Sequence, residues 1–168
     1  MVNKKIIKKK ILLLGAFAVG KTSLVSQYLT GFFSEKYLST IGVNIKSKTI
    51  ETDKQILNLI IWDIADIVTH HNIPDAYLDT SHGLLLVYDL TRPETFDRIV
   101  EEHKGFLEKV PHIPKIIIGN KIDLVEDIDL LEKTFSLNEL TNIYTSAKTG
   151  QNVKMAFDLL ADSFIDEE

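Results

Sequence analysis

Residues 15–22 read Gly-Ala-Phe-Ala-Val-Gly-Lys-Thr and match the pattern G-x-x-x-x-G-K-[ST] at every fixed position. The apolar run at 11–14, which precedes this stretch, is typical of a buried strand, and residues 21–30 predict a helix that ends at Gly31. Between a strand and a helix this pattern predicts a P-loop, whose backbone N–H groups point at phosphate oxygens. The N-terminus of the helix adds its positive dipole end at the same place.

The P-loop residues have distinct predicted roles. Lys21 can reach the β- and γ-phosphates of a nucleotide, and the hydroxyl of Thr22 can bind Mg²⁺. An ordinary glycine-containing turn is the alternative, and it is disfavoured because the whole motif lies in the expected context. The predicted phosphate-binding residues are Gly15, Ala18, Val19, Gly20, Lys21, Thr22 and Ser23.

The composition favours one compact globular domain over residues 1–168. A chain of 168 residues can bury about two-thirds of the surface that it exposes when unfolded. The hydrophobic content of 45% is ordinary, and the net charge of −5 argues against a nucleic-acid partner. Because the sequence contains no cysteine, disulfides, thiolate chemistry and cysteine-based zinc sites are excluded.

Targeting and anchoring signals are missing from the sequence. No apolar run approaches the roughly eighteen residues that a membrane-spanning helix needs, and the residues after Met1 lead into a predicted strand. The last residues, 165–168, offer no cysteine for prenylation, and Val2 is not the glycine that myristoylation requires. We therefore expect a cytoplasmic protein with no direct lipid anchor.

Strands and helices are predicted to alternate along the chain. Apolar or alternating patterns predict strands over 6–14, 43–52, 55–62, 83–88, 115–119 and 144–145. Helices are predicted over 21–30, over 93–110 with Thr91 as a candidate N-cap, and around Val153, Phe157, Leu160 and Phe164. The short polar connection at 53–54 predicts a hairpin. The predicted fold is α/β: a doubly wound, mostly parallel six-stranded sheet with one antiparallel edge hairpin, and ligands at the carboxyl ends of the strands.

A second motif, Asn120-Lys-Ile-Asp123, directly follows the predicted strand 115–119. With it the sequence resembles the Ras superfamily of small GTPases, and its Rab-like members most, in which N-K-x-D reads guanine. The Asp123 carboxylate only accepts hydrogen bonds, so it suits the N1–H and the exocyclic amine of guanine, a pattern that adenine lacks. Asn120 can accept from or donate to the base edge and can also tie the loops together, and the stem of Lys121 can lie along the face of the base.

Other segments extend the resemblance to the base and the metal. Residues 145–148, Thr-Ser-Ala-Lys, resemble the family's T-S-A-K, and residues 39–42 resemble its switch I. Residues 62–63 begin a segment that resembles W-D-T-A-G-Q-E, in which the aspartate holds Mg²⁺ through water. The similarity covers nearly the whole chain, with a shortened region between 123 and 146.

The resemblance implies a full ligand set, with Mg²⁺ as cofactor and GTP or GDP as ligand. The implied metal residues are Thr22, Thr40 and Asp63. The implied nucleotide residues beyond the P-loop are Phe33, Thr40, Asn120, Lys121, Asp123, Ser146, Ala147 and Lys148. Phe33 would lie against the guanine ring, the Ala147 N–H would meet guanine O6, and Tyr37 would belong to switch I; for both aromatic residues the alternative is packing under a loop. An effector protein would bind the switch surfaces.

Three departures from the family pattern, at Phe17, Asp66 and Ile67, fall where the family hydrolyses GTP; we call these three positions the hydrolytic corner. Ile67 replaces the glutamine that orients water and has no donor or acceptor, so no catalytic residue is predicted with confidence. Asp66 replaces a glycine whose N–H meets the γ-phosphate, which predicts GDP favoured over GTP by about ten-fold or more. Phe17 would crowd the space above the γ-phosphate. Together they predict nucleotide binding with very slow or absent hydrolysis.

Two alternatives remain open at the level of the sequence. The first is a pseudoGTPase interaction module with structural or no nucleotide, against which the intact motifs count. The second is an active GTPase in which Thr69 or His70 orients the water. A metal site at His70 and His71 is disfavoured because no third ligand supports it. We expect His82 to be structural and the lysine-rich residues 2–10 to form a solvated strand edge.

Overall fold

The computed structural model describes residues 4–36, 39–66, 73–127, 131, 135 and 140–165. The strands are β1 (Lys5–Leu14), β2 (Val43–Glu51), β3 (Gln55–Ile64), β4 (Gly83–Asp89), β5 (Lys115–Asn120) and β6 (Thr141–Thr145). The helices are α1 (Lys21–Thr30), α3 (Asp75–Asp79), α4 (Glu94–Lys109) and α6 (Val153–Ile165), with a short 3₁₀ helix η1 (Ile122–Leu124).

The strands form one six-stranded sheet in the order β2-β3-β1-β4-β5-β6. Every neighbouring pair is parallel except β2 and β3, which are antiparallel. A hydrogen bond from the Thr52 N–H to the Gln55 carbonyl, at 2.9 Å, closes the hairpin between these two strands. The predicted fold class is therefore confirmed, including the antiparallel hairpin at the edge of the sheet.

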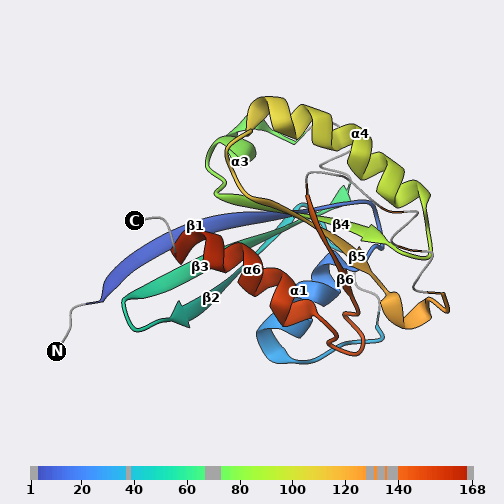
Figure 1. Ribbon diagram of the computed structural model, residues 1–168, viewed down its shortest axis with the longest axis horizontal. Helices are drawn as coiled ribbons and strands as arrows, with labels where there is room; N and C mark the ends of the chain where they lie inside the picture. The colour runs from blue at the N-terminus through green and yellow to red at the C-terminus, as the bar shows by residue number, and fades with distance from the viewer. Residues whose placement is uncertain are drawn as a thin grey trace.

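Helices cover both faces of the sheet, as Figure 1 shows, with α4 on one side and α1 and α6 on the other. All residues of β4 and β5 are buried, which explains why the interiors of these strands, 83–88 and 116–119, are continuously apolar. One core cluster joins the sheet to α1 and α6, where the rings of Tyr28 and Phe157 stack at 4.2 Å. The other cluster joins the sheet to α3 and α4. This layered core holds the carboxyl ends of the parallel strands together at one end of the molecule.

The predicted elements match the structure most closely where a motif or a glycine marks a boundary. Helix α1 ends as predicted, because Gly31 has φ 67° and donates its N–H to the Gln27 carbonyl at 2.9 Å. Strand β6 begins at Thr141, before the predicted start at 144, because its exposed polar residues conceal the strand pattern. Helix α3 and η1 were not predicted, since each is too short to show a periodic pattern.

Thr91 does not cap helix α4, so this part of the prediction is wrong. Its hydroxyl and its N–H both bond to Oδ1 of Asp89, at 2.7 and 2.9 Å. Helix α4 begins at Glu94, and the turn before it is closed by a bond of 2.9 Å from the Thr95 N–H to the Arg92 carbonyl. The Thr91 hydroxyl therefore bonds to the Asp89 carboxylate instead of capping the helix.

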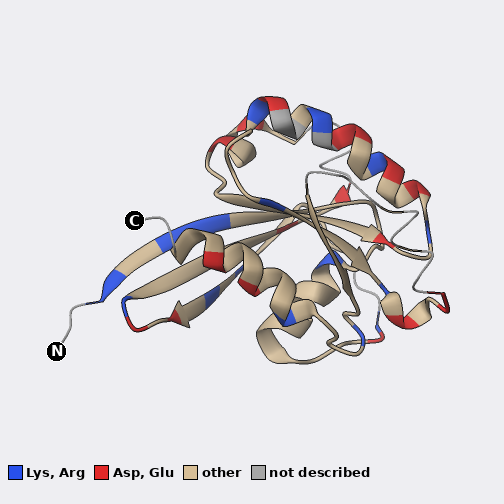
Figure 2. Ribbon diagram, viewed as in Figure 1, with Lys and Arg blue, Asp and Glu red and all other residues tan. Residues whose placement is uncertain are grey.

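The lysine-rich start of β1 is only partly the solvated edge that was predicted. Strand β4 pairs with β1 only from Ile11 onward, so one side of the outer half is open, and Figure 2 shows it rich in basic residues. Lys10, however, is only 9% exposed, and its Nζ lies 3.7 Å from the centroid of the Trp62 ring and donates to Thr80 Oγ1 at 2.7 Å. Burial lowers the pKa of Lys10. The Lys10 N–H donates to Nδ1 of His82 at 3.1 Å, in keeping with the structural role expected for that histidine.

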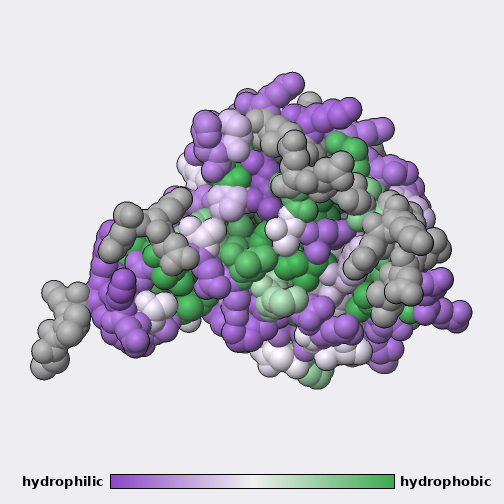
Figure 3. Space-filling view, viewed as in Figure 1, coloured by the Kyte–Doolittle hydropathy of each residue, from purple (hydrophilic) through white to green (hydrophobic). Residues whose placement is uncertain are grey.

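The surface is mixed in charge and hydropathy. Acidic and basic residues alternate along the outer side of α4 in Figure 2, while the face seen in Figure 3 has hydrophobic residues at its centre and hydrophilic residues around them. None of the helices in the described ranges has the length and hydrophobicity needed to cross a membrane.

Candidate nucleotide-binding site

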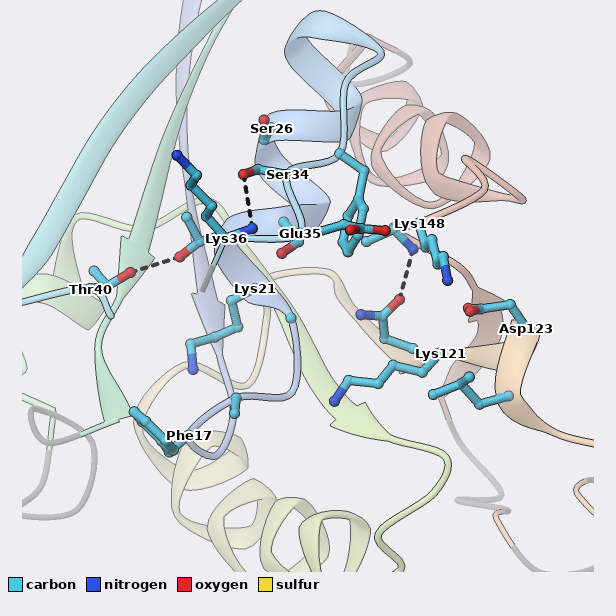
Figure 4. A pocket seen from close by; sticks show the side chains of 18 of the residues that line it. Phe17, Lys21, Ser26, Ser34, Glu35, Lys36, Thr40, Lys121, Asp123 and Lys148 are labelled. Atoms are coloured by element: carbon cyan, nitrogen blue, oxygen red, sulfur yellow. Dashed lines mark hydrogen bonds between the residues drawn. The ribbon is translucent and has the colours of Figure 1, made fainter. Parts of the chain in front are cut away.

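A cavity of about 540 Å³ lies at the carboxyl ends of the parallel strands and collects most of the predicted site residues. Those that line it are Ala18, Gly20, Lys21, Thr22, Ser23, Phe33, Thr40, Asn120, Lys121, Asp123, Ala147 and Lys148. Gly15, Val19, Asp63 and Ser146 are buried behind its wall. In Figure 4, Lys21 lies between Thr40 and Phe17 on one side and Asp123 and Lys148 on the other. The phosphate and base motifs therefore meet in one cavity.

The two glycines of the P-loop motif are required by close backbone approaches. A Cβ on Gly15 would lie 2.0 Å from the carbonyl oxygen of Val87, at the neighbouring strand β4. Gly20 has φ 102°, and a Cβ there would lie 2.2 Å from Nδ2 of Asn120. Any larger residue would push the loop away from the sheet and from the second motif.

Lys21 is enclosed by its own loop. Its Nζ donates to the carbonyl oxygens of Gly15 and Ala16 at 2.7 and 3.0 Å, and the residue is only 7% exposed. Burial lowers the pKa of Lys21, and the carboxylates of Asp63 and Asp66 oppose that effect. A positive charge is thus held next to two acidic side chains at the end of the cavity lined by the P-loop. We call this the phosphate end, and the end lined by Asp123 the base end.

The three predicted metal residues converge on one point. The hydroxyl oxygens of Thr22 and Thr40 lie 2.7 Å apart, and both hydroxyls lie within bonding distance of Asp63 Oδ2, at 2.5 and 3.3 Å. Oδ1 of Asp63 is buried and receives no hydrogen bond from any described residue. Burial raises the pKa of Asp63, against the hydrogen bond from Thr22 and the charge of Lys21. An unpaired buried carboxylate oxygen beside two hydroxyl oxygens fits a hard cation such as Mg²⁺.

We predict that Asp63→Asn will have opposite effects with and without magnesium. In EDTA the variant should melt at the same temperature as the wild type or slightly higher, because it removes a buried and incompletely bonded charge. With Mg²⁺ and GDP it should lose most of the metal-dependent rise in melting temperature that the wild type shows. Differential scanning calorimetry checks both effects, with Asp53→Asn, in the turn between β2 and β3, as a control. An equal magnesium response in variant and wild type would contradict the metal role.

Asn120 ties the phosphate end of the cavity to the base end. Its Nδ2 donates to the carbonyl oxygen of Val19 at 2.9 Å, while its Oδ1 accepts from Thr145 Oγ1 and from the Ala147 N–H, both at 3.1 Å. The residue is 1% exposed. Of the two roles predicted for Asn120, the structure shows the tying of loops, and it shows the Ala147 N–H directed at Asn120.

Asp123 is oriented by the other base motif. Its Oδ1 accepts a hydrogen bond of 2.6 Å from the Ser146 hydroxyl, which itself accepts from the Thr149 N–H at 3.0 Å. Lys121 has φ 71°, and its Nζ pairs with Asp89 Oδ2 at 2.6 Å. The side chains of Lys121 and Asp123 in the N-K-x-D motif are therefore both held by buried neighbours, Asp89 and Ser146.

Asp89, at the end of β4, is a buried acceptor for several groups. Besides the two hydrogen bonds from Thr91, its carboxylate accepts one from Lys121 Nζ and one, at 3.1 Å, from Arg92 Nε. The residue is only 1% exposed. Burial alone would raise the pKa of Asp89, but these hydrogen bonds hold it below its ordinary value. Arg92 in turn donates from Nη2 to the Phe17 carbonyl at 2.7 Å. Asp89 thus links the base motif to the third residue of the P-loop.

The hydrolytic corner contains a pairing that sequence reasoning missed. Phe17 lines the cavity and is 56% exposed, and its N–H donates to Asp66 Oδ2 at 3.0 Å. Asp66 Oδ1 forms an ion pair of 2.6 Å with Arg98 of α4. No motif marks Arg92 or Arg98, and only the fold brings them to the P-loop. The predictions made for Tyr37, Ile67, Thr69, His70 and His71 lie outside the described residues.

Several other lining residues were absent from the predicted set. They are Ser26, Ser34, Glu35, Lys36, Ala65, Asp66 and Leu124. Leu124 is 60% exposed and lies one residue beyond Asp123, so it adds an apolar surface at the base end. Residues 34–36 belong to the connection after α1, which carries no recognisable pattern of its own.

A P-loop between a parallel strand and a helix, with an enclosed lysine and an oxygen cluster beside it, defines a P-loop nucleotide-binding protein. The sequence model of the Ras family matches residues 10–166, and the chain belongs to this family. Its relatives include the Ras-related protein Rab-1 of Theileria annulata, which is 36% identical over 164 residues that cover 94% of this chain and 74% of the relative. The GTP-binding protein YPT1 of Saccharomyces cerevisiae is 34% identical over 90% of this chain and 76% of its own length. The Ras-related protein Rab7 of Drosophila melanogaster is 32% identical over 95% of this chain and 81% of its own length.

These similarities identify a Rab-like small GTPase of the Ras superfamily, a family of GTP-binding switches. Members of this family bind guanine nucleotide with Mg²⁺ and engage effector proteins.

Proposed function

We propose that residues 1–168 form a single G domain that holds guanine nucleotide with Mg²⁺ and hydrolyses GTP very slowly or not at all. It would act as a Rab-like switch or as a nucleotide-bound adaptor. The observation that carries this proposal is the single cavity, in which the enclosed Lys21, the oxygens around Asp63 and the oriented Asp123 lie together. An empty interaction module would have no need to preserve all three.

Each part of the cavity has a proposed role. The P-loop N–H groups and Lys21 bind the β- and γ-phosphates, and Asp123 accepts from the guanine edge. Bound Mg²⁺ would neutralise phosphate charge, held by the hydroxyls of Thr22 and Thr40, with Asp63 acting through water. Phe33 and Leu124 line the base end, where an apolar wall suits the faces of a purine.

A partner protein would bind the surface around Thr40. Thr40 contacts Thr22 and Asp63, so a nucleotide with Mg²⁺ would be sensed directly by the segment that carries it. Beyond Thr40 the side chain of Ile41 is 92% exposed, and that of Ile45 on β2 is 53% exposed. Exposed apolar side chains next to the sensing threonine suit an effector protein.

The proposal of slow hydrolysis depends on the corner beside Lys21. Ile67 has no group that could orient water, and Phe17 places a phenyl ring at the wall of the cavity. Asp66 fills the family's glycine position with a side chain that bonds to the P-loop. Water and an inserted arginine would both have to enter past the Phe17 ring and the Asp66 side chain, which line the cavity.

We expect single-turnover hydrolysis of pre-loaded GTP at about 10⁻⁴ s⁻¹ or slower in the presence of Mg²⁺. A family-type activating protein should not accelerate it, because its arginine would meet the Phe17 ring. Phosphate release from a one-to-one complex is the measurement. Phe17→Gly removes the obstructing ring and should let the activating protein accelerate hydrolysis, whereas the control Phe32→Ala, which changes an exposed aromatic residue after α1, should not. A rate of about 10⁻² s⁻¹ or more, as in enzymes with an arginine in cis, would contradict the proposal.

The alternative function is a pseudoGTPase interaction module with structural or no nucleotide. Denaturing the purified protein and separating the released nucleotides by chromatography tests it directly. Stoichiometric GDP or GTP would support the proposed function. The alternative would be favoured if no nucleotide were released and the refolded protein took up neither GDP nor GTP with Mg²⁺.

A further inference from the structure

The carboxylate of Asp66 is held between the P-loop and helix α4. Its Oδ2 accepts from the Phe17 N–H at 3.0 Å, and its Oδ1 lies 2.6 Å from a guanidinium nitrogen of Arg98. The Asp66 side chain is only 15% exposed. It therefore does not turn toward solvent, and it lines the same cavity as Lys21. A negative charge is fixed at the phosphate end.

Arg98 is the cation that faces this charge. A second acceptor, Glu102 Oε1, binds its Nε at 2.7 Å, one helical turn further along α4. Burial alone would lower the pKa of Arg98, but its hydrogen bonds and charge interactions with Asp66 and Glu102 raise it. Arg98 thus remains a cation and is 21% exposed, so solvent screens its pairing with Asp66 only in part.

The neighbouring arginine cannot substitute for Arg98. Arg92 uses Nε for Asp89 and Nη2 for the Phe17 carbonyl, at 3.1 and 2.7 Å. Phe17 is consequently held on both sides of its backbone, by Asp66 through its N–H and by Arg92 through its carbonyl. Asp66 is thus positioned by the Phe17 N–H of the P-loop, whereas its charge is paired with Arg98 of α4.

We propose that Arg98 is a specificity-determining residue of the nucleotide site, because it cancels the charge of Asp66 and so lets the cavity accept a third phosphate. This inference rests on the proposed function. The sequence alone predicts that Asp66 favours GDP by about ten-fold or more, since a bare carboxylate repels GTP more than GDP. The ion pair removes that bias from the wild-type chain, and loss of Arg98 would restore it.

The test compares the affinities of GDP and of a non-hydrolysable GTP analogue, each with Mg²⁺, by fluorescence titration of the nucleotide-stripped protein. The wild type should bind the two within about three-fold of each other. Arg98→Gln should shift the ratio of the two Kd values toward GDP by about ten-fold, which corresponds to about 1.4 kcal/mol. Adding Asp66→Asn to Arg98→Gln should return the ratio to that of the wild type, because the uncompensated charge that lines the cavity is then gone; Glu102, the other partner of Arg98, does not line it.

A matched control removes the same charge from the same helix. Lys109, at the end of α4, pairs with Asp75 at 2.6 Å and does not line the cavity. Lys109→Gln should leave the ratio of the two Kd values unchanged.

Four outcomes would overturn the inference. Equal weakening of both nucleotides in Arg98→Gln would mean that Arg98 only supports the structure. A ratio that stays shifted in the double variant would mean that Asp66 is not the source of the bias. If the wild type bound neither nucleotide, the proposed function itself would fail, and this inference with it; a wild type that binds both but strongly prefers GDP would overturn the inference alone.

Discussion

Asp123→Asn should cost this protein its guanine nucleotides, with GDP and GTP both bound at least about 100-fold more weakly. In the proposed role the carboxylate would accept from two donors of guanine, whereas an amide presents a donor of its own in place of one acceptor. The Ser146 hydroxyl fixes the orientation of this carboxylate at 2.6 Å, so the side chain cannot rotate freely to compensate. Xanthine nucleotides should bind the variant better, because their C2 oxygen accepts from the new amide.

Competition against fluorescent GDP and fluorescent xanthosine diphosphate measures both halves of this prediction. Asp127→Asn is the control, since it removes the same charge near η1 without lining the cavity. The role of Asp123 would be contradicted if ATP displaced labelled GDP from the wild type as well as GTP does.

Asn120→Ala should release GDP about 100-fold faster and also lower the free energy of unfolding by about 2–4 kcal/mol. The side chain makes three hydrogen bonds, to Val19, Thr145 and Ala147, in a fully buried position. Removing it leaves these groups without their partner and disconnects the P-loop from the base motif.

Asn142→Ala is the matched control for Asn120→Ala. Asn142 lies on the neighbouring strand β6 and bonds to the Tyr88 hydroxyl and to the Phe135 carbonyl, but it does not line the cavity. It should lower stability to a comparable degree and change GDP release by no more than about three-fold. Stopped-flow release of fluorescent GDP and chemical denaturation separate the two effects. Equal acceleration in both variants would show that Asn120 acts only through general stability.

The sequence predicted those parts of the fold that local pattern determines. The interiors of the buried strands β4 and β5 are continuously apolar, α1 ends at a glycine, and the polar turn at 53–54 marks the hairpin, so each leaves a signal over a few residues. The longer course of β6 and the short α3 depend on pairing and packing with distant residues. Lys10 was misjudged because its burial depends on Trp62, which reaches it only across the folded sheet.

The site residues likewise fall into those that a sequence motif marks and those that only the tertiary structure brings to the cavity. Lys21, Thr22, Asn120 and Asp123 stand in contiguous motifs, and the fold brings them to one cavity. Arg98 could not be found from the sequence, because its acceptor on the P-loop side is 32 positions away along the chain, at Asp66, and no motif connects the two. Asp66 was noticed as a departure from the family pattern, yet its effect depends on a partner that only the tertiary structure supplies.

The double attachment of the cavity through Asn120 and Asp89 has a consequence for time scales. Asn120 joins the P-loop to the base motif directly, and Asp89 joins them again through Arg92 and Lys121. Neither end of the cavity is therefore free to open alone. A bound nucleotide would leave only when both attachments open together, and its lifetime in the cavity would be set by the one barrier to that concerted opening.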